Sequence, residues 1–146
     1  MSKPIEILVG TTAGNTEFLA SELELYLQGQ GLKTEFHDYP KWDDLNLKAS
    51  FLFCIATHGA GEYAESIAEL MEHIEQLQPD LTHMHYALVA IGDSSYDTYC
   101  SAGIAANKLL QSLGAVSLSP MLKIDMMTAL EPEAIALEWL KHIRWP

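Results

Sequence analysis

The stretch IEILVGTTAGNT, residues 5–16, decides the fold, because it joins a short apolar strand to a small, hydroxyl-rich loop, GTTAGNT, at residues 10–16. An amphipathic pattern with Leu19, Leu23 and Leu27 follows and predicts a helix. The free N–H groups and the partial positive charge at the start of a helix attract a phosphate. Because the stretch contains no Lys or Arg, backbone amides and hydroxyl groups would have to hold that anion.

Taken alone, this loop leaves two interpretations open. It lacks the G-K-[ST] ending of a Walker loop and the G-x-G-x-x-G pattern of a dinucleotide-binding turn. It is therefore either a phosphate cradle or an ordinary strand-to-helix turn capped by Thr16. Two further loops favour the cradle: THGAGE, residues 57–62, follows the apolar run 51–56, and GDSSY, residues 92–96, follows the run 87–91.

Loops at the carboxyl ends of parallel strands converge at one edge of the sheet, where ligands bind. His58 and Tyr96 carry planar side chains that could sandwich a flat heterocycle. Gly59 and Gly61 would let the backbone approach the edge of that ring closely. We therefore expect a phosphate pocket that opens into a flat slot, which suits flavin mononucleotide (FMN).

Strand and helix patterns alternate along the chain, with no linker or repeat between them. Strands are expected at about residues 5–9, 33–37, 51–56, 86–91 and 116–124, with helices between them and a last helix at 132–144. This alternation predicts a doubly wound α/β fold with a parallel sheet. The length predicts a single domain over residues 1–146.

With these three loops and this alternation of strands and helices, the chain resembles the flavodoxin family over nearly its whole length. The segments GTTAGNTE, ATHGAGEYAES and ALVAIGDSSYDTYC resemble the three flavin loops of flavodoxins, most closely those of the small bacterial MioC-like group. The resemblance implies a flavodoxin-like three-layer sandwich of the short-chain type, with a five-stranded parallel sheet of order 2-1-3-4-5. It also implies FMN as the cofactor.

The resemblance assigns roles to individual residues. The first loop would contact the phosphate, His58 and Tyr96 would lie against the two faces of the ring, residues 59–61 would meet its N5 edge, and Asp93 its pyrimidine edge. Ala13 departs from the usual Ser or Thr, and His58 from the usual Trp or Tyr. The complete set of implied FMN-binding residues is Thr11, Thr12, Ala13, Gly14, Asn15, Thr16, Thr57, His58, Gly59, Ala60, Gly61, Gly92, Asp93, Ser94, Ser95, Tyr96, Tyr99 and Cys100.

The charge of the chain excludes some classes of binding partner and favours others. The net charge is −12, from 8 basic and 20 acidic residues, which argues against nucleic acid and anionic membranes as partners. No Lys or Arg occurs in residues 49–107, a window that holds two of the three loops. An acidic rim around the flavin would steer a basic flavodoxin or ferredoxin reductase toward it. Two cysteines and no leader-like apolar run predict reduced thiols in the cytoplasm.

Three classes of function are distinguishable. The first is an electron carrier that receives electrons from a reductase and serves an acceptor enzyme, for which the resemblance implies biotin synthesis as one setting. The second is an NAD(P)H-dependent quinone or nitro-compound reductase of the same fold. The third class is a response regulator, which needs a cluster of carboxylates at the ends of the first and third strands. This class is excluded, because the chain has Gly10, Thr11, Ala56 and Thr57 at those positions. No metal site is expected, because His83 and His85 have no third ligand nearby in the sequence.

Overall fold

The centre of the fold is a parallel sheet built from apolar strands. The computed structural model describes residues 3–11 and 14–146. Strands β1 (Ile5–Gly10), β3 (Ser50–His58) and β5 (His85–Gly92) are buried along most of their length, as expected for parallel strands covered on both faces. Strand β2 (Thr34–His37) forms one edge. With β6 (Val116–Ser117), the order across the sheet is β2-β1-β3-β5-β6.

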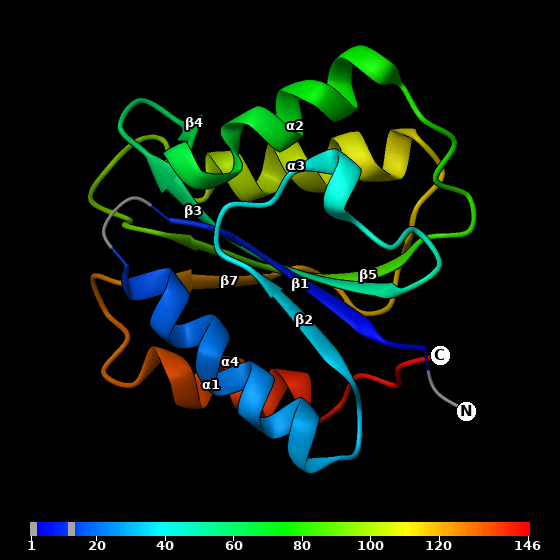
Figure 1. Ribbon diagram of the computed structural model, residues 1–146. Coiled ribbons are helices and arrows are strands. Elements are labelled where there is room, and N and C mark those ends of the chain that lie inside the picture. Colours follow the sequence, from blue (N-terminus) through cyan, green and yellow to red (C-terminus); the bar gives the residue numbers. More distant parts are fainter. Residues whose placement is uncertain (1–2, 12–13) are drawn as a thin grey trace.

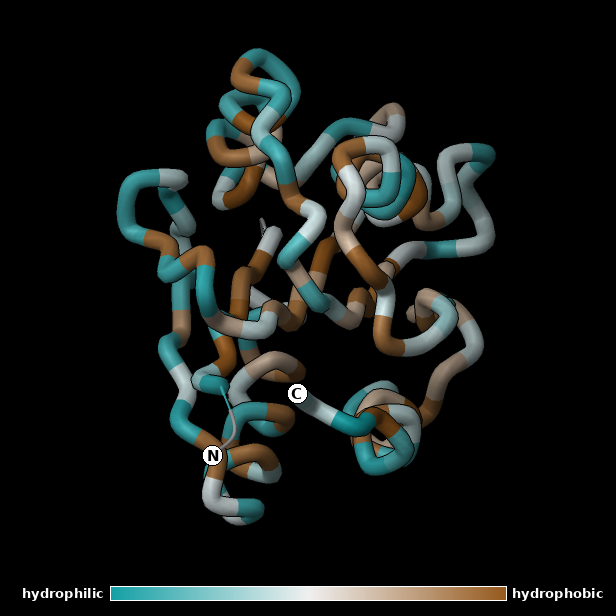
Figure 2. Tube along the Cα trace, turned by 90° about the vertical axis from the view of Figure 1, so that its right-hand side faces the viewer, coloured by the Kyte–Doolittle hydropathy of each residue, from teal (hydrophilic) through white to brown (hydrophobic). Residues whose placement is uncertain are grey.

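Helices cover both faces of the sheet, so the molecule has three layers (Figure 1). Helices α1 (Asn15–Gly29) and α4 (Pro132–Leu140) lie on one face, and α2 (Glu65–Leu77) and α3 (Ser101–Ser112) on the other. A hydrophobic cluster fills each of the two interfaces. Figure 2 shows hydrophobic segments concentrated at the sheet in the middle of the molecule. The predicted α/β fold with a parallel sheet is confirmed.

The predicted number of strands is wrong, because the described residues form a sheet of seven strands rather than five. The strand expected at 116–124 is divided into β6 (Val116–Ser117) and β7 (Leu122–Asp125), which both pair with β5. Pro120 lies in the gap and has no N–H to donate to the ladder of β5. A further strand, β4 (Glu62–Tyr63), folds back antiparallel on the end of β3.

One other element differs in detail from the sequence expectation. The last helix ends at Leu140 rather than 144, where His142 N and Ile143 N donate to carbonyl oxygens only three residues back. The polar stretch 39–48, which is expected from the sequence to be a loop with a short helix, holds a 3-10 helix at Trp42–Asp44. Among the residues that the structure describes, no helix is both long and apolar enough to cross a bilayer.

The register of the sheet brings the three loops together. Gly10 pairs with Ile55 of β3, and Ala56 pairs with Ile91 of β5. Strands β1, β3 and β5 therefore end at the same edge, so that the loops that follow them are neighbours.

Candidate functional site

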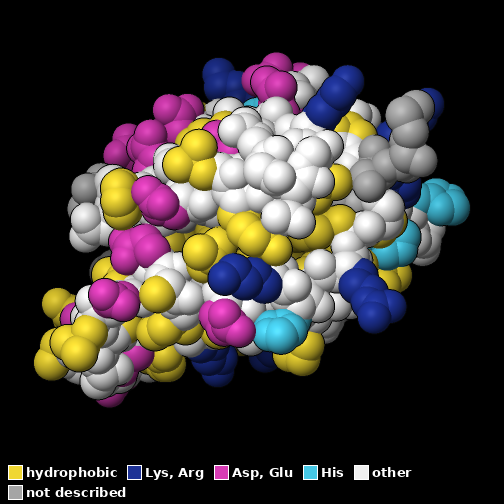
Figure 3. Space-filling view, turned by 90° about the horizontal axis from the view of Figure 1, so that it is seen from below, with side chains coloured by type: hydrophobic (Ala, Val, Ile, Leu, Met, Phe, Trp, Pro, Cys, Tyr) yellow, Lys and Arg dark blue, Asp and Glu magenta, His cyan; other side chains and the backbone are white. Residues whose placement is uncertain are grey.

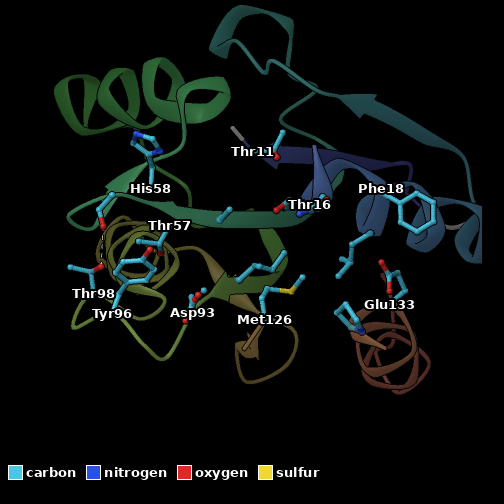
Figure 4. Close-up of a pocket in the computed structure, with 17 residues that line it drawn as sticks. Thr11, Thr16, Phe18, Thr57, His58, Asp93, Tyr96, Thr98, Met126 and Glu133 are labelled. Atoms are coloured by element: carbon cyan, nitrogen blue, oxygen red, sulfur yellow. Dashed lines mark hydrogen bonds between the residues drawn. The ribbon is translucent and has the colours of Figure 1, made fainter. Parts of the chain in front are cut away.

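A cavity of about 580 Å³ opens at this edge of the sheet. All three loops contribute to its walls, and so do the starts of α1 and α4 (Figure 4). Its lining consists of Thr11, Asn15, Thr16, Phe18, Leu19, Ala56, Thr57, His58, Gly59, Ile91, Gly92, Asp93, Tyr96, Thr98, Met126, Pro132 and Glu133.

The first loop is shaped by hydrogen bonds to its backbone. Gly14 precedes α1 with a φ of 89°, a left-handed conformation that favours glycine, and its N–H donates to Thr11 Oγ1 at 3.0 Å. Thr11 N in turn donates to Ser66 Oγ of α2 at 2.8 Å, and that hydroxyl donates to Val9 O at 2.9 Å. Ser66 thus connects the first loop to α2 and to β1.

The second loop turns sharply at two glycines. Gly59 has a φ of 48° and Gly61 a φ of 108°, and Gly61 N donates to His58 O at 3.0 Å. Thr57 Oγ1 accepts the N–H of Ala102 at 3.0 Å, which fixes the end of β3 to the start of α3. In Figure 4 the His58 ring lies above the end of β3 and the Tyr96 ring below it.

Two carboxylates hold the third loop. Asp93 Oδ1 accepts the N–H of Ser95 at 2.8 Å, and Asp125 Oδ1, at the end of β7, accepts those of Ser94 and Met127 at 3.0 Å each. The hydrogen bonds from Ser94 hold the pKa of Asp125 below its usual range. The loop is therefore anchored to the neighbouring strand by an ionised carboxylate.

A glycine at position 92 is required by packing rather than by its dihedral angles. A Cβ atom there would lie 2.6 Å from the backbone nitrogen of Cys100, closer than real Cβ atoms approach. Gly92 therefore lets the segment before α3 fold tightly over the end of β5.

The structure divides the residues that the sequence predicts to bind FMN into three groups by their position. Nine of the implied residues line the cavity, namely Thr11, Asn15, Thr16, Thr57, His58, Gly59, Gly92, Asp93 and Tyr96. Thr12 and Ala13 lie outside the described residues. The others belong to the same loops but do not line the cavity, namely Gly14, Ala60, Gly61, Ser94, Ser95, Tyr99 and Cys100.

Two of these non-lining residues face elsewhere. Tyr99 borders a second, separate hollow beside β7. Cys100 is fully buried, its Sγ lies 3.5 Å from Ala90 O, and burial raises the pKa of its thiol. This placement fits a packing role for Cys100.

Sequence reasoning missed part of the lining. Met126, Pro132 and Glu133 come after the last strand, and that position at the carboxyl edge was a usable signal. Phe18 and Leu19 belong to the first turns of α1, and Thr98 lies two residues beyond Tyr96.

The chemistry of the lining fits a flavin nucleotide. Thr11, Asn15 and the buried Thr16 place polar groups where α1 begins and its N–H groups are free. Leu19, Ala56 and Ile91 add apolar side chains to the lining. The cavity thus combines polar groups at the start of α1, suited to a phosphate, with apolar lining suited to a flat ring.

Comparison with known proteins agrees with this chemistry. The family model described as flavodoxin matches residues 7–139. The chain is 34% identical over 134 residues to a MioC homologue of Haemophilus influenzae, covering 92% of each chain. It is 32% identical over 136 residues to MioC of Escherichia coli K12, covering 93% of this chain and 92% of the relative.

The chain belongs to the flavodoxin family. The solved structure of a cysteine-to-alanine mutant of flavodoxin from Pseudomonas aeruginosa superimposes with a TM-score of 0.87 at 27% identity, covering 94% of each chain. This flavodoxin is of the short-chain, MioC-like type, and it is an electron-transfer protein with FMN as its cofactor.

Proposed function

We propose that this flavodoxin is a low-potential carrier that takes electrons from a basic reductase and passes them to an acceptor redox enzyme in the cytoplasm. The observation that carries the proposal is the cavity at which the three loops meet. Bound FMN would supply the redox-active ring, and the protein would supply binding, orientation and electrostatics.

The residues that would hold FMN follow from the two ends of the cavity. Thr11, Asn15, Thr16 and the N–H groups at the start of α1 would bind the phosphate. The loops that carry His58 and Tyr96 would enclose the ring, with Asp93 beside its polar edge. Thr57 would mainly stabilise the end of β3 rather than bind FMN, because its hydroxyl oxygen already accepts a hydrogen bond from Ala102 N.

The charge of the lining supports a low potential. Asp93 and Glu133 are the ionisable acids of the lining, and no Lys or Arg lines the cavity within the described part of the chain. Carboxylates near the ring disfavour the addition of negative charge to it. Full reduction of the flavin should therefore be harder in this site than in water.

The alternative function is an NAD(P)H-dependent reductase of quinones or nitro compounds. Such an enzyme needs a place for a second nucleotide beside the flavin, and basic side chains usually hold its phosphates. The lack of Lys and Arg in the described lining favours the carrier.

The experiment that tests the proposal is reconstitution of apoprotein with FMN, FAD and riboflavin. We expect FMN to bind most tightly, because the polar end of the cavity would contact its phosphate. The FMN-loaded protein should oxidise NADPH only when a flavodoxin reductase is added. NADPH oxidation without reductase would support the alternative, and tighter binding of FAD would contradict the phosphate site.

The acceptor enzyme is the finer part of the proposal. The likeness to MioC proteins makes an enzyme of biotin synthesis the first acceptor to examine. Electron delivery from the reduced protein to that enzyme, measured as product formed per reducing equivalent, would test this assignment.

A further inference from the structure

The second and third loops are joined by the side chain of Thr98. Its hydroxyl donates a hydrogen bond to the carbonyl oxygen of Gly59 at 3.2 Å, drawn as a dashed line in Figure 4. Its methyl group lies against Gly61, where a built Cβ would be 3.4 Å from Thr98 Cγ2. Thr98 also lines the cavity, two residues beyond Tyr96 of the third loop.

This contact differs from the other hydrogen bonds that hold the loops. Ser66 accepts the N–H of Thr11, and Asp125 accepts the N–H of Ser94. The Ser66 hydroxyl also donates to a carbonyl, that of Val9, but neither residue lines the cavity. Thr98 and the Gly59 residue whose carbonyl it binds both line it. Because Gly59 has no Cβ and a φ of 48°, its peptide group is freer to reorient than that of any other residue type at this position.

An acceptor at this place is chemically relevant to a flavin. The N5 atom of the oxidised ring accepts hydrogen bonds, whereas uptake of one electron from a reductase and one proton from water forms an N5–H bond that needs an acceptor. The resemblance to flavodoxins implies that residues 59–61 meet that edge of the ring, and Gly59 lines the cavity. The Gly59 carbonyl is therefore the acceptor that we infer for N5–H. While Thr98 binds this oxygen, the carbonyl is held in an orientation set by the third loop.

We propose that Thr98 is a positioning residue that holds the Gly59 carbonyl and thereby lowers the midpoint potential for the first electron. This inference rests on FMN occupying the cavity as proposed above. A carbonyl oxygen can accept two hydrogen bonds, so the effect of Thr98 lies in the orientation that its hydroxyl imposes on the Gly59 carbonyl. Turning this carbonyl toward an N5–H donor would cost the hydrogen bond from Thr98. Without the hydroxyl that cost disappears, so that the protonated ring gains stability relative to the oxidised ring.

The test compares the FMN-loaded wild type with Thr98→Val and Thr98→Ser. Valine keeps the branched shape without the hydroxyl, and serine keeps the hydroxyl without the methyl group. Spectroelectrochemical titration gives the midpoint potentials of both electrons, and fluorescence titration of apoprotein gives the FMN dissociation constant. Thr98→Ala serves as the hydroxyl-free variant if valine prevents folding.

We expect Thr98→Val to raise the equilibrium constant for the first electron by up to about tenfold, which corresponds to about 59 mV for a one-electron couple. Thr98→Ser should keep the wild-type potential. Equal first-electron potentials in the wild type and the valine variant, or an equal shift in the serine variant, would overturn the proposal. Wild-type apoprotein that does not bind FMN would instead overturn the proposed function, so the two failures are distinguishable.

Discussion

Ser66 lies on α2, outside all three loops, yet its hydroxyl orders the first of them. It accepts the N–H of Thr11 at 2.8 Å and donates to Val9 O at 2.9 Å, and the residue is buried. Removal of one partner leaves a buried polar group unsatisfied, which costs about 1–3 kcal/mol. We expect Ser66→Ala to lower the free energy of unfolding by about that amount and to weaken FMN binding.

Urea unfolding and FMN titration would measure these two effects of Ser66→Ala. Ser112→Ala is the matched control, because the Ser112 hydroxyl is exposed and donates to Leu109 O within its own helix. That control should change the free energy of unfolding by less than about 0.5 kcal/mol. Wild-type FMN affinity in Ser66→Ala would show that the first loop does not depend on this hydroxyl.

At the same scale, the sequence revealed the loops but not the contacts that shape them. Gly59, Asp93 and Tyr96 were predicted because each belongs to a recognisable loop after a strand. The Thr11–Ser66 contact joins residues 55 positions apart, and the Thr98–Gly59 contact joins residues 39 positions apart. Such pairs depend on how α2 and the third loop pack, which no local pattern contains.

Among the elements, α3 shows how a glycine can be a packing requirement inside a helix. Glycine in a helix interior usually costs roughly 0.5–1 kcal/mol relative to alanine. At Gly103, however, an added Cβ would overlap the Ala90 side chain and lie 3.1 Å from Ala90 Cα. We therefore expect Gly103→Ala to destabilise the protein by about 1–3 kcal/mol, because α3 would be pushed away from β5.

Gly29→Ala in the last turn of α1 is the control for Gly103→Ala, since a Cβ there meets nothing within 4 Å. Thermal unfolding would measure the melting temperature of both variants. We expect Gly103→Ala to lower it and Gly29→Ala to leave it unchanged or raise it. A stabilised Gly103→Ala would mean that α3 and β5 have room for the extra methyl group.

The elements also show where sequence periodicity stops being informative. The central strands were predicted almost residue by residue, because buried parallel strands are continuous apolar runs. The interruption between β6 and β7 was missed, although Pro120 marks it. The two-residue strand β4 could not be predicted, because it forms only when the second loop folds back on β3.

At the scale of the whole molecule, the alkylation rates of the two buried thiols measure how readily the folded protein opens. Cys54 lies in the core and burial raises the pKa of its thiol to about 12, while burial also raises the pKa of Cys100. Alkylation requires the thiolate, which is scarce well below the pKa. At about pH 8, close to the reference pKa of a free cysteine, we expect both thiols to react far more slowly in the native protein than in urea.

Cys54→Ser and Cys100→Ser would separate the two thiols in that measurement, followed by mass spectrometry of the alkylated protein. Each variant keeps one thiol. Equal alkylation rates of these two thiols under native conditions would indicate that one cooperative opening exposes both. Faster reaction of the Cys100 thiol than of the Cys54 thiol would instead show that the segment before α3 opens locally.

The distribution of charge over the whole molecule predicts how it meets a reductase. Figure 3 shows the face that α1 and α4 cover, with Asp and Glu side chains gathered toward the left end, where the loops lie. Glu62, Glu65 and Asp97 are exposed beside the second and third loops. Attraction between such acids and a basic partner is screened over a Debye length of about 10 Å at 0.1 M salt. Reduction by a basic reductase should therefore slow as salt rises.

Neutralisation of this acidic rim isolates its contribution to the salt dependence. The triple variant Glu62→Gln, Glu65→Gln, Asp97→Asn should reduce the slope of log rate constant against ionic strength in stopped-flow reduction by the reductase. The matched control removes three equal charges farther along α2, Glu69→Gln, Glu72→Gln, Glu75→Gln, all exposed in the structure. Both variants have the same net charge, so a difference between them reports position alone. If both triples change the slope equally, long-range net charge rather than a rim around the flavin directs the encounter.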